Sequence, residues 1–514
     1  MRSTWVWLLA AVLVGAAACG GGGQAGSRPD TAGSGGSGTV PADGGGADAG
    51  ADAGTGAGTD AGTDGGTDAG TPDAGSDGGV SIVIPNAAGW TFHHAQDGLI
   101  STQVMGASAD EGGNLWVAGG KSGVFVLRKG QTSFQRFTLA DGLHPFGYLA
   151  DGSPADTDPY LEAISIAGGP AGTAFVGYMG KPPPAGHLAC EDNWDSDATP
   201  DPAIYKSGDA DKVTLKATGG LDVVHFDIFS GPFVVPAELR GREKLCNVFR
   251  IVYEHGTRNV WFGANHGFAW GHADFAGDPT CDGEYPGNVN SPLHVNCAGV
   301  WEHVHPAISG SLGEVLTGDY YGVALDLVQP HDVWFGGIIR TTRFKFGELG
   351  DYYLAETATE NDASNKIDVW PDQVPDNPSR GQRKDDVVSG IVALPDGSIL
   401  VGSFAWGVRH LSRSGALIGD VGGLQDPHVT ALARDPEDGS VWVGYTGFGF
   451  GVSQIMPDGT VRHYNSQTLG SSLSNSAVTD IQVDTFTRTV DPSVKHDRVI
   501  VSFRDGVVGV FTAP

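Results

Sequence analysis

A short strand pattern that recurs seven times constrains the fold of this chain more than any other feature. Each copy is a run of β-branched or aromatic residues that ends in a small residue, as in Val441-Trp442-Val443-Gly444. Such runs favour β-strands, and the small residue predicts a point where a neighbouring backbone comes close. The copies lie at residues 115–118, 174–177, 260–263, 333–336, 399–402, 441–444 and 499–502.

The flanks of the repeated strand recur as well. An alternating strand such as 429–432 precedes most copies, with a turn such as Pro395-Asp396-Gly397 between the two. Asp-Gly pairs are typical of tight hairpins. A third strand follows, and a fourth in most copies. Four strands in each of seven repeats predict an all-β fold, a seven-bladed β-propeller of four-stranded antiparallel blades over residues 81–514, with the repeated Trp residues packed between blades.

The two ends of the repeat region predict how the ring closes. The seventh copy reaches residue 514 after only three strands. The region opens with residues 90–99, WTFHHAQDGL, which match the fourth-strand stretch FQRFTLADGL at residues 134–143. We therefore expect the last blade to be closed by the N-terminal strand, which would leave few exposed strand edges.

The order of motifs in the first repeat is similar to that of a known propeller family. Asp97-Gly98-Leu99, then residues 110–119 (DEGGNLWVAG), then Gly123-Val124-Phe125 resemble the two-component-regulator propeller repeat. The resemblance covers most of residues 89–514, is specific in the first, sixth and seventh copies, and is loose in the second to fourth. It implies a ligand-binding sensor platform of the kind found in bacterial hybrid kinases. Those sensors usually continue into a β-sandwich, a transmembrane helix and a kinase. The resemblance here covers the propeller repeats alone, so it implies only the binding platform.

The N-terminal residues predict export and lipid attachment. Arg2 precedes an apolar run at residues 5–14 that is too short to span a bilayer comfortably, and Gly15-Ala16-Ala17-Ala18 precedes Cys19. This order resembles the lipobox of bacterial lipoproteins, although Ala16 stands where Leu is more common. The resemblance implies a signal peptide at residues 1–18 and acyl chains on Cys19 that insert into a lipid bilayer. An ordinary secretory signal with an incidental cysteine is the alternative.

Low-complexity sequence follows the predicted lipid anchor. Residues 19–80 consist almost wholly of Gly, Ala, Asp, Thr and Ser. They carry too few large apolar side chains to offset the loss of chain entropy, so we expect a disordered tether with an r.m.s. span of roughly 40 Å. The formal net charge of −30 argues against nucleic acid as a partner. Gly20 stands where inner-membrane lipoproteins often have Asp, which favours the outer membrane, on its periplasmic or cell-surface side.

Four cysteines remain if Cys19 carries lipid, and they fall in long insertions of the second and third repeats. An even number of cysteines in an exported protein predicts disulfides. Three pairings are possible, and proximity in sequence favours Cys190 with Cys246 and Cys281 with Cys297. The absence of a Cys-x-x-Cys motif gives no support to a thiol redox or zinc-ribbon role.

The turns after the repeated strand are expected to carry the ligand site, because propellers bind ligands on the loops at one mouth of the central channel. Aromatic rings beside cations suit a glycan, a peptide or another small polar ligand. Some of these aromatics could instead pack between blades. The candidate ligand-binding residues are Lys121, His266, Arg340, Trp406, Tyr445, Phe448 and Arg504.

Metal binding and catalysis have little support in the sequence. Asp192, Asp195 and Asp197 could supply oxygen ligands to Ca²⁺, but no Gly and no closing Glu complete the helix–loop–helix calcium motif, so a solvated acidic loop is favoured. We therefore expect no cofactor, with Ca²⁺ as the alternative. No Gly-x-Ser-x-Gly motif is present, and we assign no catalytic residue.

Three functions fit these observations. The favoured one is a membrane-anchored extracytoplasmic lipoprotein whose propeller binds a glycan, peptide or protein ligand as a sensor-like recognition module. A propeller lyase or hydrolase with residues from separate blades is the second. A structural or assembly subunit of the cell envelope is the third. The first is favoured because the family resemblance implies ligand sensing and no catalytic motif is visible.

Overall fold

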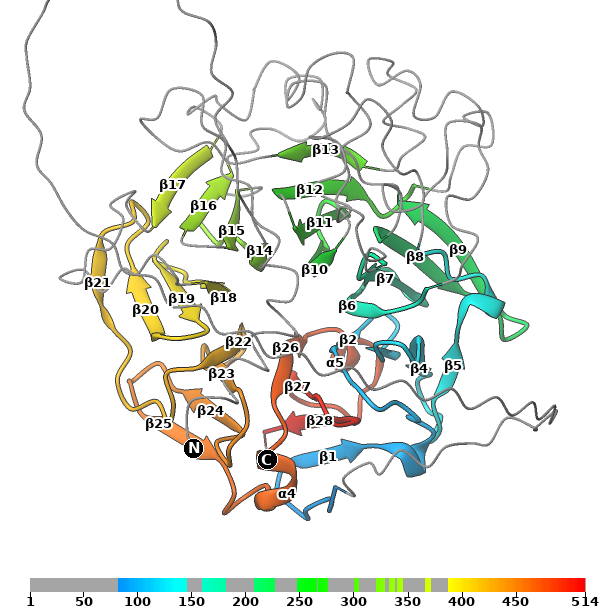
Figure 1. The fold of residues 1–514 in the computed structure, drawn as a ribbon. Helices are drawn as coiled ribbons and strands as arrows, with labels where there is room; N and C mark the ends of the chain where they lie inside the picture. The colour runs from blue at the N-terminus through cyan, green and yellow to red at the C-terminus, as the bar shows by residue number, and fades with distance from the viewer. Residues whose placement is uncertain are drawn as a thin grey trace, which may run out of the picture. The chain divides into compact units, whose positions relative to one another are not determined.

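The computed structural model describes residues 82–145, 160–181, 208–226, 247–265, 267–275, 300–304, 320–328, 332–337, 340–344, 366–370 and 387–513. For residues 267, 269, 270, 300–304, 340, 342, 344 and 366–370 it describes the backbone alone. Over these ranges the chain forms four-stranded antiparallel sheets arranged around a central channel (Figure 1). No helix in this described part is long and apolar enough to cross a membrane.

Seven such sheets are present among the described residues, and in the first six the innermost strand comes first in sequence. The first contains β2 (Gly106–Ala109), β3 (Leu115–Ala118), β4 (Val124–Leu127) and β5 (Gln135–Phe137). The second contains β6 (Ala163–Gly168), β7 (Thr173–Tyr178), β8 (Ala210–Leu215) and β9 (Leu221–Phe226). The third contains β10 (Val248–Glu254), β11 (Asn259–Ala264), β12 (Gly267–His272) and β13 (Val300–Val304).

The remaining sheets follow the same plan. The fourth contains β14 (Tyr320–Leu325), β15 (Val333–Gly337), β16 (Arg340–Phe344) and β17 (Lys366–Trp370). The fifth contains β18 (Val388–Ala393), β19 (Ile399–Ser403), β20 (Gly407–Leu411) and β21 (Leu417–Asp420). The sixth contains β22 (Val429–Arg434), β23 (Val441–Tyr445), β24 (Val452–Ile455) and β25 (Val461–Tyr464). The seventh contains β26 (Val478–Asp484), β27 (Arg498–Phe503), β28 (Val507–Thr512) and β1 (Trp90–His93).

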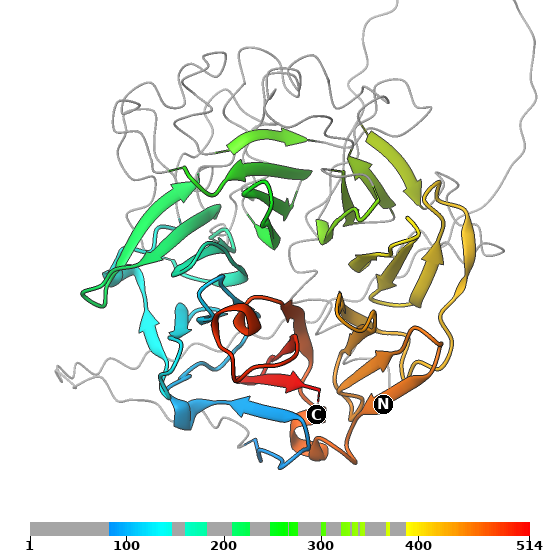
Figure 2. The ribbon, with the colours of Figure 1, turned by 180° about the vertical axis from the view of Figure 1, so that it is seen from behind.

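The innermost strands pack side by side in one cycle, β2, β6, β10, β14, β18, β22, β26 and back to β2 (Figures 1 and 2). The prediction of an all-β propeller with four-stranded antiparallel blades is therefore confirmed. The N-terminal strand β1 pairs with β28, from Trp90 opposite Phe511 to His93 opposite Val508, which is the closure that the sequence predicted. Short helical turns lie between strands at Ala95–Asp97, Leu139–Asp141, Gly470–Ser474 (α4) and Thr487–Val490 (α5).

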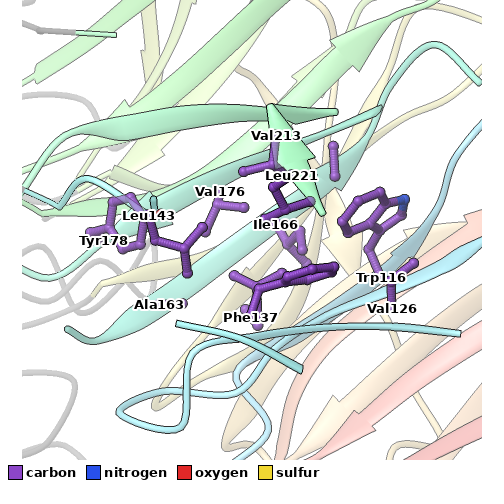
Figure 3. Packing of buried hydrophobic residues seen from close by; sticks show 13 residues of the cluster. Trp116, Val126, Phe137, Leu143, Ala163, Ile166, Val176, Tyr178, Val213 and Leu221 are labelled. Atoms are coloured by element: carbon purple, nitrogen blue, oxygen red, sulfur yellow. The ribbon is translucent and has the colours of Figure 1, made fainter. Parts of the chain in front are cut away.

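The repeated Trp residues form the core between blades, as expected. Trp116, Trp261, Trp334 and Trp442 are all fully buried. Figure 3 shows one such interface, where Trp116 packs with residues of the second sheet such as Val176. Because a Trp ring is large and apolar, its burial stabilises the contact between neighbouring blades.

An acidic residue at the end of an inner strand fixes the indole in two of these blades. The Trp116 indole Nε1 donates to Asp110 at 2.9 Å, and the Trp334 indole Nε1 donates to Asp326 at 2.7 Å. Asp110 also accepts from the backbone N–H of Gly172 in the next blade, at 3.0 Å. Burial raises the pKa of Asp110, although the hydrogen bonds from Trp116 and its own turn oppose that effect.

The small residue that ends each repeated strand lies where the next blade packs. A Cβ atom placed on Gly444 would lie 2.5 Å from the Val478 side chain of β26. One placed on Gly336 would lie 2.3 Å from the Val388 side chain of β18. Both distances are too short for real atoms, so the close approach of neighbouring blades that the repeat predicted is confirmed.

Candidate functional site

A β-bulge near the start of the inner strands directs side chains into the mouth of the channel. In β10 the pairing register shifts between Val248 and Arg250, which leaves Phe249 as the extra, unpaired residue. Bulges re-aim a side chain and are common beside functional sites. The same shift occurs in six of the described inner strands, and the extra residues are Ile164, Phe249, Tyr321, Ser389, Thr430 and Thr479.

All six bulge residues line one pocket, which Met105 completes just before β2. The bulge side chains are apolar or aromatic on β6, β10 and β14, and they carry hydroxyl groups on β18, β22 and β26. The cavity volume is ≈ 70 Å³. Pockets that enclose a drug-sized ligand have roughly 300–1,000 Å³. A pocket this small admits one functional group or side chain, and the rest of a ligand would lie outside it.

Three aromatic rings form a wall of this mouth pocket. The ring centroids of Phe249 and Tyr321 lie 4.5 Å apart with an interplanar angle of 39°. Phe404, from the turn between β19 and β20, meets the Tyr321 ring edge-on at 5.6 Å. Aromatic pairs at these separations gain stability beyond their burial, so the wall is expected to be rigid.

Two hydroxyl groups in the same pocket are buried without a partner. Ser389 is 1% exposed and Thr430 is 6% exposed. Neither hydroxyl oxygen has a hydrogen-bond partner among the described residues. A buried polar group left unsatisfied destabilises a protein by about 1–3 kcal/mol. The neighbouring Thr479 differs, because its hydroxyl donates to the Val104 carbonyl at 2.9 Å.

Arg504 contributes the cation of the pocket. It begins the turn between β27 and β28 and is partly buried. Its backbone is held on both sides, since its N–H donates to the Ala477 carbonyl at 2.8 Å and its carbonyl accepts from the Val104 N–H at 2.8 Å. Within the part of the chain that the structure describes, its guanidinium makes no ion pair and no hydrogen bond.

An ion pair crosses the channel below the mouth pocket. Arg250 of the third sheet pairs with Asp480 of the seventh, and the Arg250 Nε donates to the Tyr321 carbonyl at 3.2 Å. The Gln482 side chain donates to Asp480 at 2.8 Å and to the Ile166 carbonyl at 2.9 Å. A second cavity, of ≈ 220 Å³, lies on the other side of this pair, and Arg250 lines both cavities. The ion pair thus forms the floor of the mouth pocket.

Comparison with known proteins leaves the function open. No family model and no curated protein matches this chain. The resemblance to the two-component-regulator repeat therefore stays a prediction. Many solved chains match, and one is described as "YCF48 bound to D1 peptide". It is 10% identical with a TM-score of 0.44, over 84% of this chain and 100% of that one. The chain is a β-propeller. That assignment rests on the seven four-stranded sheets described above and not on YCF48.

The predicted ligand-binding residues of the propeller do not all reach this pocket. Arg504 lines it. Trp406 and Phe448 are 41% and 59% exposed on the turns of the fifth and sixth blades, and Phe448 has a φ of 59°, in the left-handed region that non-glycine residues rarely adopt. Lys121 is exposed, with its Nζ 5.9 Å from the centre of the Tyr160 ring.

Tyr445 packs inside the sixth blade. It is fully buried, and its hydroxyl donates to Ser453 at 2.8 Å. Burial raises its pKa. This is the packing alternative that the sequence left open for the turn aromatics, and a ligand could reach Tyr445 only if the blade opened.

Several predicted residues lie partly or wholly outside the described part of the chain. Arg340 is the first residue of β16, but its side chain lies outside the described residues. The structure describes no group of three or more His, Cys, Asp or Glu residues that could hold a metal ion. The predictions that fall outside the described residues are His266, the lipid anchor Cys19, the calcium candidates Asp192, Asp195 and Asp197, and the disulfide candidates Cys190, Cys246, Cys281 and Cys297.

The bulge residues were missed from the sequence. Each follows the first residue of an inner strand, as Thr430 follows Val429 and Thr479 follows Val478. A Val-Thr or Val-Ser pair at that position is a weak signal, because strict alternation places the polar residue on the opposite face from its neighbour. The bulge shifts that alternation by one residue, and only the paired strands reveal it.

Proposed function

We propose that this protein is an exported lipoprotein whose propeller is a sensor-like recognition module for a glycan, peptide or protein ligand. The ligand would bind at the channel mouth. The observation that carries the proposal is the pair of buried hydroxyls of Ser389 and Thr430, which face the pocket without a hydrogen-bond partner among the described residues. Unsatisfied polar groups are retained where a ligand or an ordered water completes them. The resemblance to the two-component-regulator repeat supports the same role.

The carboxylates at the mouth support recognition over catalysis. Glu162 accepts a hydrogen bond from the Tyr160 hydroxyl, and Asp480 is paired with Arg250. A general base must lie within hydrogen-bond reach of the proton that it removes. Both carboxylates are already held by a neighbouring side chain, whereas Arg504 and the two hydroxyls have no such partner among the described residues.

The binding proposal is tested by a thermal-shift screen of the full chain against oligosaccharides, peptides and small metabolites. A ligand that binds the native state raises the unfolding midpoint. The double variant Ser389→Ala with Thr430→Val removes both hydroxyls. Its free energy of unfolding should equal that of the wild type or exceed it by about 1 kcal/mol, because two unsatisfied buried groups have been removed. It should also lose the ligand-induced shift.

Ser414→Ala is the matched control, because Ser414 is an exposed serine on the turn after β20. It should leave both stability and ligand response unchanged. A ligand whose shift survives in the double variant would bind elsewhere, and the mouth would then not be the recognition site.

Membrane attachment is proposed through Cys19 and a tether at residues 19–80, with the outer membrane as the location. Metabolic labelling with an alkyne fatty acid should mark the wild-type chain. Cys19→Ala should abolish the label and move the protein from the membrane fraction to the soluble fraction, because the acyl chains supply the anchoring energy. A Cys19→Ala chain that remains membrane-bound would show that another segment anchors it.

A further inference from the structure

We infer that the mouth pocket recognises a carboxylate group that is attached to an apolar or aromatic group. This inference rests on the proposed binding function and specifies the chemistry of the ligand. It follows from the charges, the hydroxyls and the aromatic wall of the same pocket.

The charges at the mouth favour a single negative charge. Four side chains that are charged at neutral pH line the pocket: Arg250, Arg504, Glu162 and Asp480. Arg250 and Asp480 neutralise each other in the floor of the pocket. Arg504 is left as a cation without a counter-ion among the described residues, and a partly buried cation gains from an opposite charge. Glu162 has no ion pair among the described residues and would repel a second negative charge, so a dianion such as phosphate is disfavoured.

The hydroxyl groups favour a carboxylate as the source of that charge. An ionised carboxylate has two oxygens and about four lone-pair directions, and it accepts hydrogen bonds without donating any. Arg504 offers a fork of N–H donors, and Ser389 and Thr430 each offer an O–H that has no acceptor among the described residues. Charge-assisted hydrogen bonds of this kind are roughly twice as strong as neutral ones. A primary amide presents only one oxygen, and its NH₂ cannot accept from the N–H donors of Arg504.

The aromatic wall specifies what is attached to the carboxylate. Phe249 and Phe404 both pack against Tyr321, and the apolar side chains of Met105 and Ile164 line the same cavity. A cavity of ≈ 70 Å³ holds the carboxylate and only part of its substituent. The substituent would therefore contact the aromatic wall while the remainder of the ligand stays at the open rim.

The test is a calorimetric titration of the full chain with ligand pairs that differ only in the charged group. The probes are N-acetyl-phenylalanine and its amide, free phenylalanine, and a short peptide that ends in phenylalanine as the acid or as the amide. Each acid should bind at least about tenfold more tightly than its amide. Inorganic phosphate should not compete. Comparison of free phenylalanine, the acetylated form and the peptide distinguishes a free amino acid from a chain terminus as the source of the carboxylate.

Arg504→Gln should remove the preference for acid over amide, and Arg504→Lys should keep part of it, because lysine retains the charge without the fork. Arg462→Gln is the control, since Arg462 is exposed on β25. Thermal unfolding of each variant establishes that it is folded.

The inference would be overturned if acid and amide bound equally well and both lost their affinity in the Ser389→Ala, Thr430→Val variant. The mouth would then bind a ligand of another chemical class. Binding of a neutral glycan alone at the mouth would also overturn the inference. If no probe and no ligand from the screen binds at the mouth, the inference and the proposed function both fail.

Discussion

Replacing His225 with alanine should lower the free energy of unfolding by about 3–5 kcal/mol, because it removes the cation that two buried carboxylates share. The His225 ring lies between two aspartates of the second blade. Its Nε2 is 3.2 Å from an Asp209 oxygen, and its Nδ1 is 2.9 Å from an Asp211 oxygen. All three side chains are buried, with exposures of 4% for His225 and 0% for both aspartates. Urea unfolding of the wild-type chain and the variant measures the difference.

The same cluster should make stability fall at alkaline pH. Burial alone would lower the pKa of His225, but the hydrogen bonds and charges of Asp209 and Asp211 outweigh it and raise the pKa to about 9. Between the ordinary pKa of 6.5 and this value, the folded chain holds a proton that the unfolded chain has released. The stabilisation is therefore complete below pH 6.5 and is lost as the pH rises through 9.

Urea unfolding between pH 6 and pH 10 checks this dependence. His225→Ala should remove the fall in stability that the wild-type chain shows over that range. His496→Ala is the control, because His496 is 46% exposed and its partner among the described residues is Glu437 on the surface. A wild-type stability that stays level from pH 6 to pH 10 would mean that His225 is neutral in the folded protein.

Replacing Asp480 with alanine should also destabilise the propeller by about 3 kcal/mol, because Arg250 would lose its counter-charge in the floor of the mouth pocket. The Asp480 side chain is 5% exposed and the Arg250 side chain is 16% exposed, so water can replace only part of the lost interaction. Gln482 would also lose one hydrogen-bond acceptor. Urea unfolding at neutral pH measures the change.

A double-mutant cycle isolates the ion pair itself. Arg250→Met combined with Asp480→Ala should be clearly less destabilised than the sum of the two single variants, since neither charge is then left alone. Additive effects of the two changes would show that the residues stabilise the channel independently.

The fold could be predicted from the sequence because the signals that define it are local. The repeated strand contains a buried Trp in several copies and ends in a small residue such as Gly444. Both features can be recognised within four residues of sequence. The turns are equally local: Gly397 has a φ of 86° in the Asp-Gly turn that the sequence indicated. Closure by β1 could be predicted because its sequence matches that of a fourth strand.

The site was only partly predictable because its geometry depends on pairing between strands and on neighbouring blades. Tyr445 ends the repeated strand of the sixth blade and Trp406 lies in the turn after that of the fifth, yet Tyr445 is fully buried and Trp406 is 41% exposed. The Tyr445 hydroxyl donates to Ser453 and accepts from the Gln425 backbone N–H, and no local sequence motif predicts those partners. The His225 cluster joins residues 14 and 16 positions apart, so sequence spacing gave no indication of it.

The central claim is that a ligand binds at the channel mouth through the bulge residues of the inner strands. The measurement that tests it most directly is a calorimetric titration of the full chain with the ligand that gives the largest thermal shift, repeated on the Ser389→Ala, Thr430→Val variant. We predict that the variant remains folded, is at least as stable as the wild type, and loses at least about tenfold in affinity. An unchanged affinity in a folded variant would contradict the claim and place the binding site elsewhere on the propeller.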